Sequence, residues 1–223
     1  MSTKLGIIAE GPIDHALLPV LLERIARDRA DYDWPVSTDD VAEVFQIRKR
    51  GHGGVLETVR NLVSALSTQV YGHAFYVILL DRRTQAVQRE VRKLVSKHDR
   101  FILGIAIEEI EAWWLADRTN TLAWTGLSSS LPATCRFAKP RYQSERDDDP
   151  KRTIDELTQL SDRFDRYYGR GNLEIAREFV ENHWKDHARL DDLRTQCPRG
   201  YVPFEQAVTN EFRSAAGRAR RLF

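Results

Sequence analysis

Short apolar runs alternate with amphipathic stretches along the first 125 residues of the chain. The apolar runs, which are typical of buried strands, cover residues 4–10, 41–49, 73–81 and 100–107. The segments with helical periodicity cover residues 15–30, 55–71, 84–98 and 108–117. Four strand–helix units in succession predict an α/β fold, a Rossmann-like open parallel sheet of about four strands with helices on both faces.

The second half of the chain has a different pattern. Residues 125–152 are rich in Ser, Pro and charged residues and predict a long loop. Helical segments follow at residues 153–168, 173–196 and 202–223. We therefore expect three parts: an α/β core over residues 1–125, a loop over 126–150, and a helical C-terminal extension over 151–223 that packs on the core.

Composition narrows the class of protein only slightly. The 223 residues carry 34 Lys and Arg against 33 Asp and Glu, a net charge of +1, so overall charge favours no partner class. The two cysteines, Cys135 and Cys197, are far apart, which argues against a disulfide framework and favours a cytoplasmic protein. No apolar run approaches membrane-spanning length and the start is unlike a signal peptide, so we expect no membrane association.

Acidic residues follow three of the four predicted strands. Glu10 ends the first strand, Asp81 ends the third, and Glu108, Glu109 and Glu111 follow the fourth. Ligands of open α/β sheets bind beyond the carboxyl ends of the strands, which all lie at one edge. The pattern therefore predicts a cluster of carboxylates at that edge.

The second predicted strand ends in basic residues instead, at positions 48–50, which include Lys49. Carboxylates with basic neighbours suggest a hard divalent cation, Mg²⁺ or Mn²⁺, and an anionic substrate such as a phosphodiester. The alternative is that Asp14, Asp81 and Glu108 only cap helices, because acidic residues are common at helix starts. The coincidence of three strand ends favours a site.

At these residues the sequence resembles the Toprim fold of topoisomerases, primases and OLD-type nucleases. The segment EGPID supplies Glu10 and Asp14, and LLDRR supplies Asp81. The closer resemblance is to a bacterial Toprim-like family, domain of unknown function 4276. Its further segments have counterparts here in IEAWWLAD (110–117), DPK (149–151) and CPRGYVPF (197–204).

The resemblance implies metal-dependent phosphodiester chemistry, often beside an ATPase in phage-defence loci. It assigns metal binding to Glu10, Asp14, Asp81, Glu109 and Glu111, with Glu10 and Asp81 as catalytic residues. The residues that would hold substrate phosphate are Lys49, Arg83 and Lys151.

One position departs from the family pattern. The Asp-x-Asp of Toprim proteins reads Asp81-Arg82-Arg83 here. Arg83 cannot bind a metal, but its guanidinium can bind a phosphate through two hydrogen bonds. We therefore expect one metal ion rather than two, and slow or partner-dependent cleavage.

Together these features predict a Mg²⁺-dependent nuclease that acts on DNA or RNA, as the effector of an ATPase-linked phage-defence system. The main alternative is a non-catalytic Toprim-like interaction module that binds an ATPase partner or nucleic acid. A third reading is another phosphoryl-transfer enzyme that acts on nucleotides. The sequence does not choose DNA over RNA, and it leaves a homodimer open.

Overall fold

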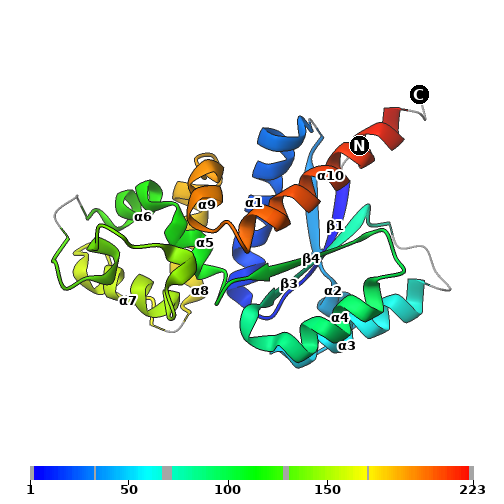
Figure 1. Ribbon diagram of the computed structural model, residues 1–223, viewed down its shortest axis with the longest axis horizontal. Helices are drawn as coiled ribbons and strands as arrows, with labels where there is room; N and C mark the ends of the chain where they lie inside the picture. The colour runs from blue at the N-terminus through cyan, green and yellow to red at the C-terminus, as the bar shows by residue number, and fades with distance from the viewer. Residues whose placement is uncertain (1–2, 33, 67–71, 128–130, 170, 221–223) are drawn as a thin grey trace.

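Four parallel strands form the centre of the fold (Figure 1). The computed structural model describes residues 3–32, 34–66, 72–127, 131–169 and 171–220. The strands are β1 (Thr3–Ile8), β2 (Val36–Asp40), β3 (Phe75–Asp81) and β4 (Phe101–Ala106), in the order β2-β1-β3-β4. The predicted α/β fold, an open parallel sheet flanked by helices with further helices at the C-terminal end, is confirmed, and it is consistent with a Rossmann-like fold.

Helices connect the strands and make up most of the second half. The α-helices are α1 (Pro12–Ala30), α2 (Val41–Val44), α3 (Gly51–Leu66), α4 (Gln85–Val95), α5 (Glu111–Ala116), α6 (Arg118–Thr125), α7 (Pro150–Leu160), α8 (Leu173–Phe179), α9 (Leu190–Gln196) and α10 (Tyr201–Arg220). Shorter turns are η1 (Arg82–Thr84), η2 (Arg136–Ala138), η3 (Ser144–Arg146) and the π-helical η4 (Val180–Trp184). Within the described ranges, no helix has the length and apolar character needed to cross a bilayer.

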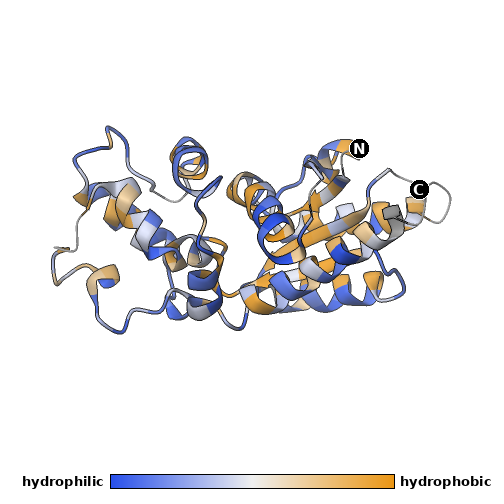
Figure 2. Ribbon diagram, turned by 90° about the horizontal axis from the view of Figure 1, so that it is seen from above, coloured by the Kyte–Doolittle hydropathy of each residue, from blue (hydrophilic) through white to orange (hydrophobic). Residues whose placement is uncertain are grey.

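The two faces of the sheet are covered by different helices. Helices α1 and α10 lie on one face and α3 and α4 on the other (Figure 1). Side chains of β3 alternate between these layers, so that Val77 packs toward α1 while Ile78 packs toward α3. Figure 2 shows hydrophobic residues concentrated along the strands. A Cβ atom at Gly104 would lie 2.7 Å from the Phe204 ring, so glycine at this position lets α10 lie close to β4.

The predicted strand over residues 41–49 is wrong. Strand β2 lies just before it, has the polar sequence VSTDD and pairs only with β1, at the edge of the sheet. The side chain of Asp40 accepts a hydrogen bond from the Ala42 amide at 2.9 Å, which starts α2 directly after the strand. The basic residues 48–50 therefore lie between α2 and α3 instead of at a strand end, and α3 begins at Gly51, before the helix predicted from residue 55.

Helices α5 to α9 gather beside the sheet (Figure 1). Two adjacent tryptophans, Trp113 and Trp114, link this part to the core, and the side chains of both are fully buried. Trp114 stacks on Phe179 of α8 with 4.4 Å between ring centroids, and Trp113 lies 5.1 Å from the ring of Phe204 in α10. The expected helix over residues 173–196 is divided, because η4 and a turn separate α8 from α9.

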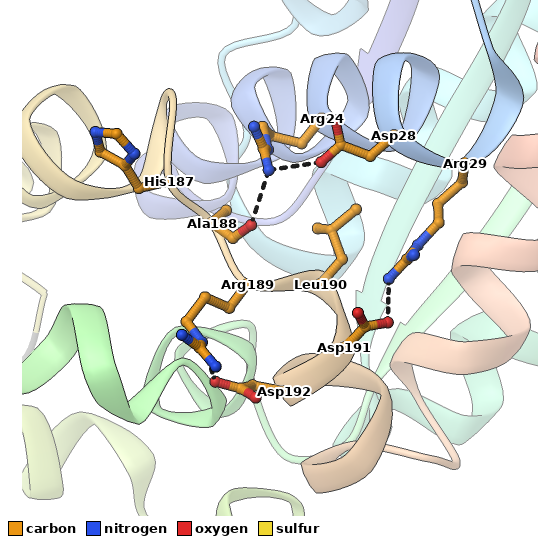
Figure 3. Close-up of a pocket in the computed structure, with 9 residues that line it drawn as sticks. All are labelled: Arg24, Asp28, Arg29, His187, Ala188, Arg189, Leu190, Asp191 and Asp192. Atoms are coloured by element: carbon orange, nitrogen blue, oxygen red, sulfur yellow. Dashed lines mark hydrogen bonds and ion pairs between the residues drawn. The ribbon is translucent and has the colours of Figure 1, made fainter.

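Polar contacts also fix the extension to α1. The Arg24 guanidinium donates to the backbone oxygens of Asp186 at 3.0 Å and Ala188 at 3.2 Å. Arg29, further along α1, forms an ion pair with Asp191 (Figure 3). The core and the extension are thus joined by both apolar and ionic contacts.

Candidate functional site

The candidate site lies where the sheet order reverses. The chain leaves β1 toward β2 on one side, and β3 lies on the other side of β1. In open α/β sheets this switch point is where ligands bind. Glu10 follows β1 and Asp81 ends β3, and the Asp81 amide donates to Glu10 Oε1 at 3.1 Å. The two carboxylates therefore lie at the carboxyl ends of neighbouring strands, at one edge of the sheet.

Asp14 joins them from the first turn of α1. Its Oδ2 accepts a hydrogen bond from the Gly11 amide at 2.8 Å, so Asp14 does cap its helix. The residue is also buried. Burial, followed by the nearby charges of Glu111 and Glu10, raises the pKa of the Asp14 carboxyl to about 7, although the Gly11 hydrogen bond opposes this. Asp14 thus caps α1 and also lies near other carboxylates, so the two interpretations do not exclude each other.

Asp81 also has a raised pKa. Burial is the largest cause that raises its pKa, to about 8. The charges of Asp14, Glu10, Glu109 and Glu111 add to the effect, in that order. We call these five residues the acidic cluster: Glu10, Asp14, Asp81, Glu109 and Glu111. The charges of the other four act on Asp81, so the five residues predicted to bind metal lie near one another.

Lys151 from α7 faces two members of the acidic cluster. Its Nζ lies 3.1 Å from Glu109 and 3.7 Å from Glu111. Burial alone would lower the pKa of the Lys151 ammonium, but the charges of Glu111 and Glu109 raise it overall. The predicted phosphate ligand Lys151 is therefore part of the site, where it neutralises part of the carboxylate charge.

Glu111 and Glu109 have different surroundings. Glu111 is almost fully buried, and burial raises its pKa although Lys151 and a hydrogen bond from Tyr168 oppose the shift. The Tyr168 hydroxyl donates to Glu111 Oε1 at 2.7 Å. In contrast, the buried Oε2 of Glu109 has no hydrogen-bond partner among the described residues. Such an orphaned acceptor is costly unless a ligand or water satisfies it.

Glu108 stands apart from the cluster and holds the two arginines that follow β3. Its backbone is left-handed, with a φ of 62°, an uncommon conformation for a residue other than glycine. It forms ion pairs with Arg82 and with Arg83, the latter at 3.2 Å. Arg83 also donates to the backbone oxygen of Asp148 at 2.8 Å and approaches Glu109 at 3.9 Å. Arg83 thus borders the acidic cluster without entering it.

Lys49 approaches the site through its loop. The side chain is exposed, and the loop leads into α3, whose first amide, Gly51 N–H, donates to the Glu10 backbone oxygen at 3.0 Å. A Cβ atom at Gly54 would lie 2.1 Å from the Lys49 oxygen, so this tight turn depends on glycine. The third predicted phosphate ligand therefore lies on a loop that contacts the acidic edge.

The chemistry of the acidic cluster fits Mg²⁺ or Mn²⁺, since hard divalent cations prefer carboxylate oxygens. The buried, unpartnered Oε2 of Glu109 is an oxygen that such a cation would satisfy. Across the described ranges, however, no three His, Cys, Asp or Glu side chains form a ready ligand set. In the arrangement seen here, Lys151 supplies the positive charge that faces Glu109.

A pocket of about 290 Å³, separate from the acidic cluster, lies between α1 and residues 187–192 (Figure 3). Its three guanidinium groups already have partners. Arg24 pairs with Asp28 at 2.5 Å, Arg189 pairs with Asp192 at 2.7 Å, and Arg29 pairs with acidic residues of α9 and α10. We assign this pocket a structural role in joining α1 to the extension.

Tyr168 was missed in the sequence, and no local signal points to it. It lies 57 positions from Glu111, in the segment between α7 and α8, and only the packing of the extension brings the two together. No protein-family model, curated protein or solved structure matches this chain. The likeness to the Toprim-like family therefore rests on the quoted motifs.

Proposed function

We propose that the protein is a Mg²⁺- or Mn²⁺-dependent nuclease that hydrolyses phosphodiester bonds in DNA or RNA. One observation carries the proposal: the acidic cluster brings five carboxylates together at the switch point of the sheet, where burial, followed by the charges of the other four, raises the pKa of Asp81 to about 8. A divalent cation would relieve this repulsion and bind carboxylate oxygens, the ligands that it prefers. Strongly perturbed carboxyl groups at such a location are typical of functional sites.

The residues of the acidic cluster would act as ligands of the metal. Glu10 and Asp81 would hold the metal from neighbouring strands, together with Asp14, Glu109 and Glu111. When bound, the metal polarises a phosphate oxygen and lowers the pKa of a bound water. As ligands of the metal these carboxyl groups would be ionised, because a nearby positive charge favours the carboxylate form and lowers its pKa.

Basic residues around the cluster would hold the substrate. Lys151 and Arg83 pair with carboxylates, and an incoming metal would release them to bind phosphate oxygens. Lys49 is exposed on the loop that contacts Glu10 and could approach the phosphate from the other side. A role beside an ATPase partner in cytoplasmic phage defence, as well as a homodimer, is supported only by the resemblance to the Toprim-like family.

A non-catalytic interaction module is the second candidate, and one observation favours it. Lys151 already neutralises Glu109 and Glu111, and no ready ligand set is present in the described part of the chain. A protein that had lost catalysis could keep this fold as a surface for an ATPase partner or nucleic acid. A third candidate, phosphoryl transfer on nucleotides, would use the same cluster.

Cleavage of labelled DNA and RNA, single- and double-stranded, separates these candidates. We expect the wild type to cleave in Mn²⁺ or Mg²⁺ and to be inactive in EDTA. Asp81→Asn should lose cleavage, whereas the control Asp99→Asn, at an exposed residue before β4, should keep it. Cleavage that survives both EDTA and Asp81→Asn would overturn the proposal. Metal binding without cleavage of any nucleic acid would favour the interaction module.

A further inference from the structure

A basic pocket lies on the loop that connects α6 to α7, a segment to which the acidic cluster assigns no role. It has a volume of about 310 Å³. Its charged lining consists of Arg136, Lys139, Arg141, Arg146, Asp147 and Asp148. Four cations against two carboxylates leave this pocket with an excess of two positive charges, although the chain as a whole is nearly neutral.

Among the described residues, one of these four cations forms ion pairs with carboxylates. Arg136 pairs with Asp148 at 2.8 Å and with Asp147 at 3.4 Å. The side chains of Lys139, Arg141 and Arg146 are exposed and form no ion pair with any described residue. Three positive charges on one loop therefore remain available to an anionic ligand.

Buried carboxylates hold the frame of the pocket in place. Asp147 accepts hydrogen bonds from the Tyr142 hydroxyl at 2.8 Å and the Thr153 hydroxyl at 2.6 Å. Glu145 accepts from the backbone amides of Arg199 at 3.0 Å and Gly200 at 2.6 Å. These bonds tie the loop to the start of α7 and to the segment before α10, so the cations project from a fixed backbone.

The pocket adjoins the acidic cluster. The Asp148 backbone oxygen accepts from Arg83, and the Asp148 carboxylate accepts from Arg136, so a single residue joins the two sites. Three positions further along the chain, Lys151 pairs with Glu109 of the cluster. A ligand with several phosphates could therefore lie in the pocket and reach the acidic edge at the same time.

We propose that the basic pocket binds backbone phosphates of a nucleic-acid strand beside the acidic cluster. The choice of a polynucleotide rests on the proposed function, whereas the affinity for a polyanion rests on the pocket itself. A carboxylate cluster repels a polyanion, so binding requires cations nearby that compensate for this repulsion. Contacts with phosphates position a strand without reading its sequence, which suits three flexible surface cations.

Binding measured without cleavage tests this proposal. Fluorescence anisotropy in EDTA would follow labelled single-stranded DNA and the equivalent RNA at several salt concentrations. The variant Lys139→Gln/Arg141→Gln/Arg146→Gln should bind roughly 100-fold more weakly at about 0.1 M salt, and its slope of log affinity against log salt should be shallower by about 2. The matched control is Arg92→Gln/Lys93→Gln/Lys97→Gln, which removes three exposed charges near the end of α4 and should behave like the wild type.

The outcomes separate this proposal from the nuclease proposal. If the pocket variant and the control bind equally well, the pocket proposal is wrong even when the wild type cleaves nucleic acid. If only the pocket variant loses binding, the pocket proposal stands even when no cleavage occurs. A mononucleotide added at the same phosphate concentration should compete poorly. Equal competition would assign the pocket to a single phosphate group and overturn the proposed strand.

Discussion

The backbone amide of Asp81 donates a hydrogen bond to the side chain of Glu10 across 71 positions of sequence. This 3.1 Å contact joins the ends of β1 and β3 at the switch point of the sheet. It also fixes one oxygen of Glu10 at the backbone of Asp81, whose carboxyl pKa is raised to about 8 by burial and then by the charges of nearby carboxylates, Glu10 among them. The fold thus keeps two acidic groups close together, at a cost that a bound cation would offset.

The first prediction concerns the pH dependence of stability without metal. Asp81 has an ordinary pKa of 3.8 and a pKa of about 8 in the fold. Between these values the folded protein retains a proton that the unfolded chain has released, so the free energy of unfolding falls as pH rises. The raised pKa of Asp14 acts in the same direction. We expect Tm in EDTA to fall from about pH 5 to about pH 8.

Thermal unfolding of variants isolates the groups that cause this fall. Asp81→Asn should flatten the profile, because the amide does not ionise. Asp99→Asn, at an exposed position, should keep the wild-type slope. If the Asp81→Asn profile parallels that of the wild type, ionisation of the Asp81 carboxyl does not cause the fall of Tm with pH.

Lys151 provides the second prediction. Lys151→Met removes the cation that faces Glu109 and Glu111 and leaves the buried Glu111 with less compensation. We expect a loss of roughly 2 kcal/mol in EDTA, less than for a fully buried pair because Lys151 is partly exposed. Added Mn²⁺ should restore more stability to this variant than to the wild type.

The matched control for Lys151 is its neighbour. Arg152 is exposed and pairs only with Glu156, one turn along α7, among the described residues. Arg152→Met should change the free energy of unfolding by about 0.5 kcal/mol or less. Equal effects of the two substitutions, measured by urea unfolding, would show that Lys151 is an ordinary surface residue.

Tyr168 provides the third prediction. Tyr168→Phe removes the hydroxyl that donates to buried Glu111, and a lost hydrogen bond to a charged group typically costs about 1.5–3 kcal/mol. The adjacent Tyr167 is 54% exposed, so Tyr167→Phe should be nearly neutral and serves as the control. Urea unfolding of both variants measures the difference. A neutral Tyr168→Phe would mean that Glu111 is held without this bond.

Arg83 provides the fourth prediction, at the position where the chain departs from the Asp-x-Asp pattern. Arg83→Ala should weaken nucleic-acid binding about tenfold, because it removes one cation that we propose binds phosphate at the edge of the cluster. It should leave metal binding intact, and calorimetry should give one metal ion per chain. Arg89→Ala, exposed on α4, is the control. Two tightly bound ions, or unchanged nucleic-acid binding, would contradict this role of Arg83.

The sheet and most of the acidic cluster could be predicted because they depend on local patterns. Apolar runs marked β1, β3 and β4, and parallel strands place the residues that follow them at one edge. Strand β2 was not predicted because an edge strand is less completely covered by helices and needs no apolar run. The apolar residues Val41 and Val44, which suggested a strand, belong to α2.

The surroundings of the cluster could not be predicted from local pattern. Lys151 faces Glu109 and Tyr168 faces Glu111 only because the extension packs beside the sheet. The resemblance placed Lys151 near phosphate, but it did not indicate an ion pair with the carboxylates. The contact of Arg83 with the Asp148 backbone oxygen likewise depends on the path of the loop between α6 and α7.

Titration of Mn²⁺ against thermal stability tests most directly whether the acidic cluster is a cation site. We predict that the wild type is stabilised, by about 2.7 kcal/mol at a metal concentration one hundred times its Kd. The variant Glu10→Gln/Asp81→Asn, which keeps the shape of both side chains, should show no such gain. A wild type that is not stabilised by millimolar Mn²⁺, or a variant stabilised to the same extent, would contradict the assignment of the cluster as the metal site.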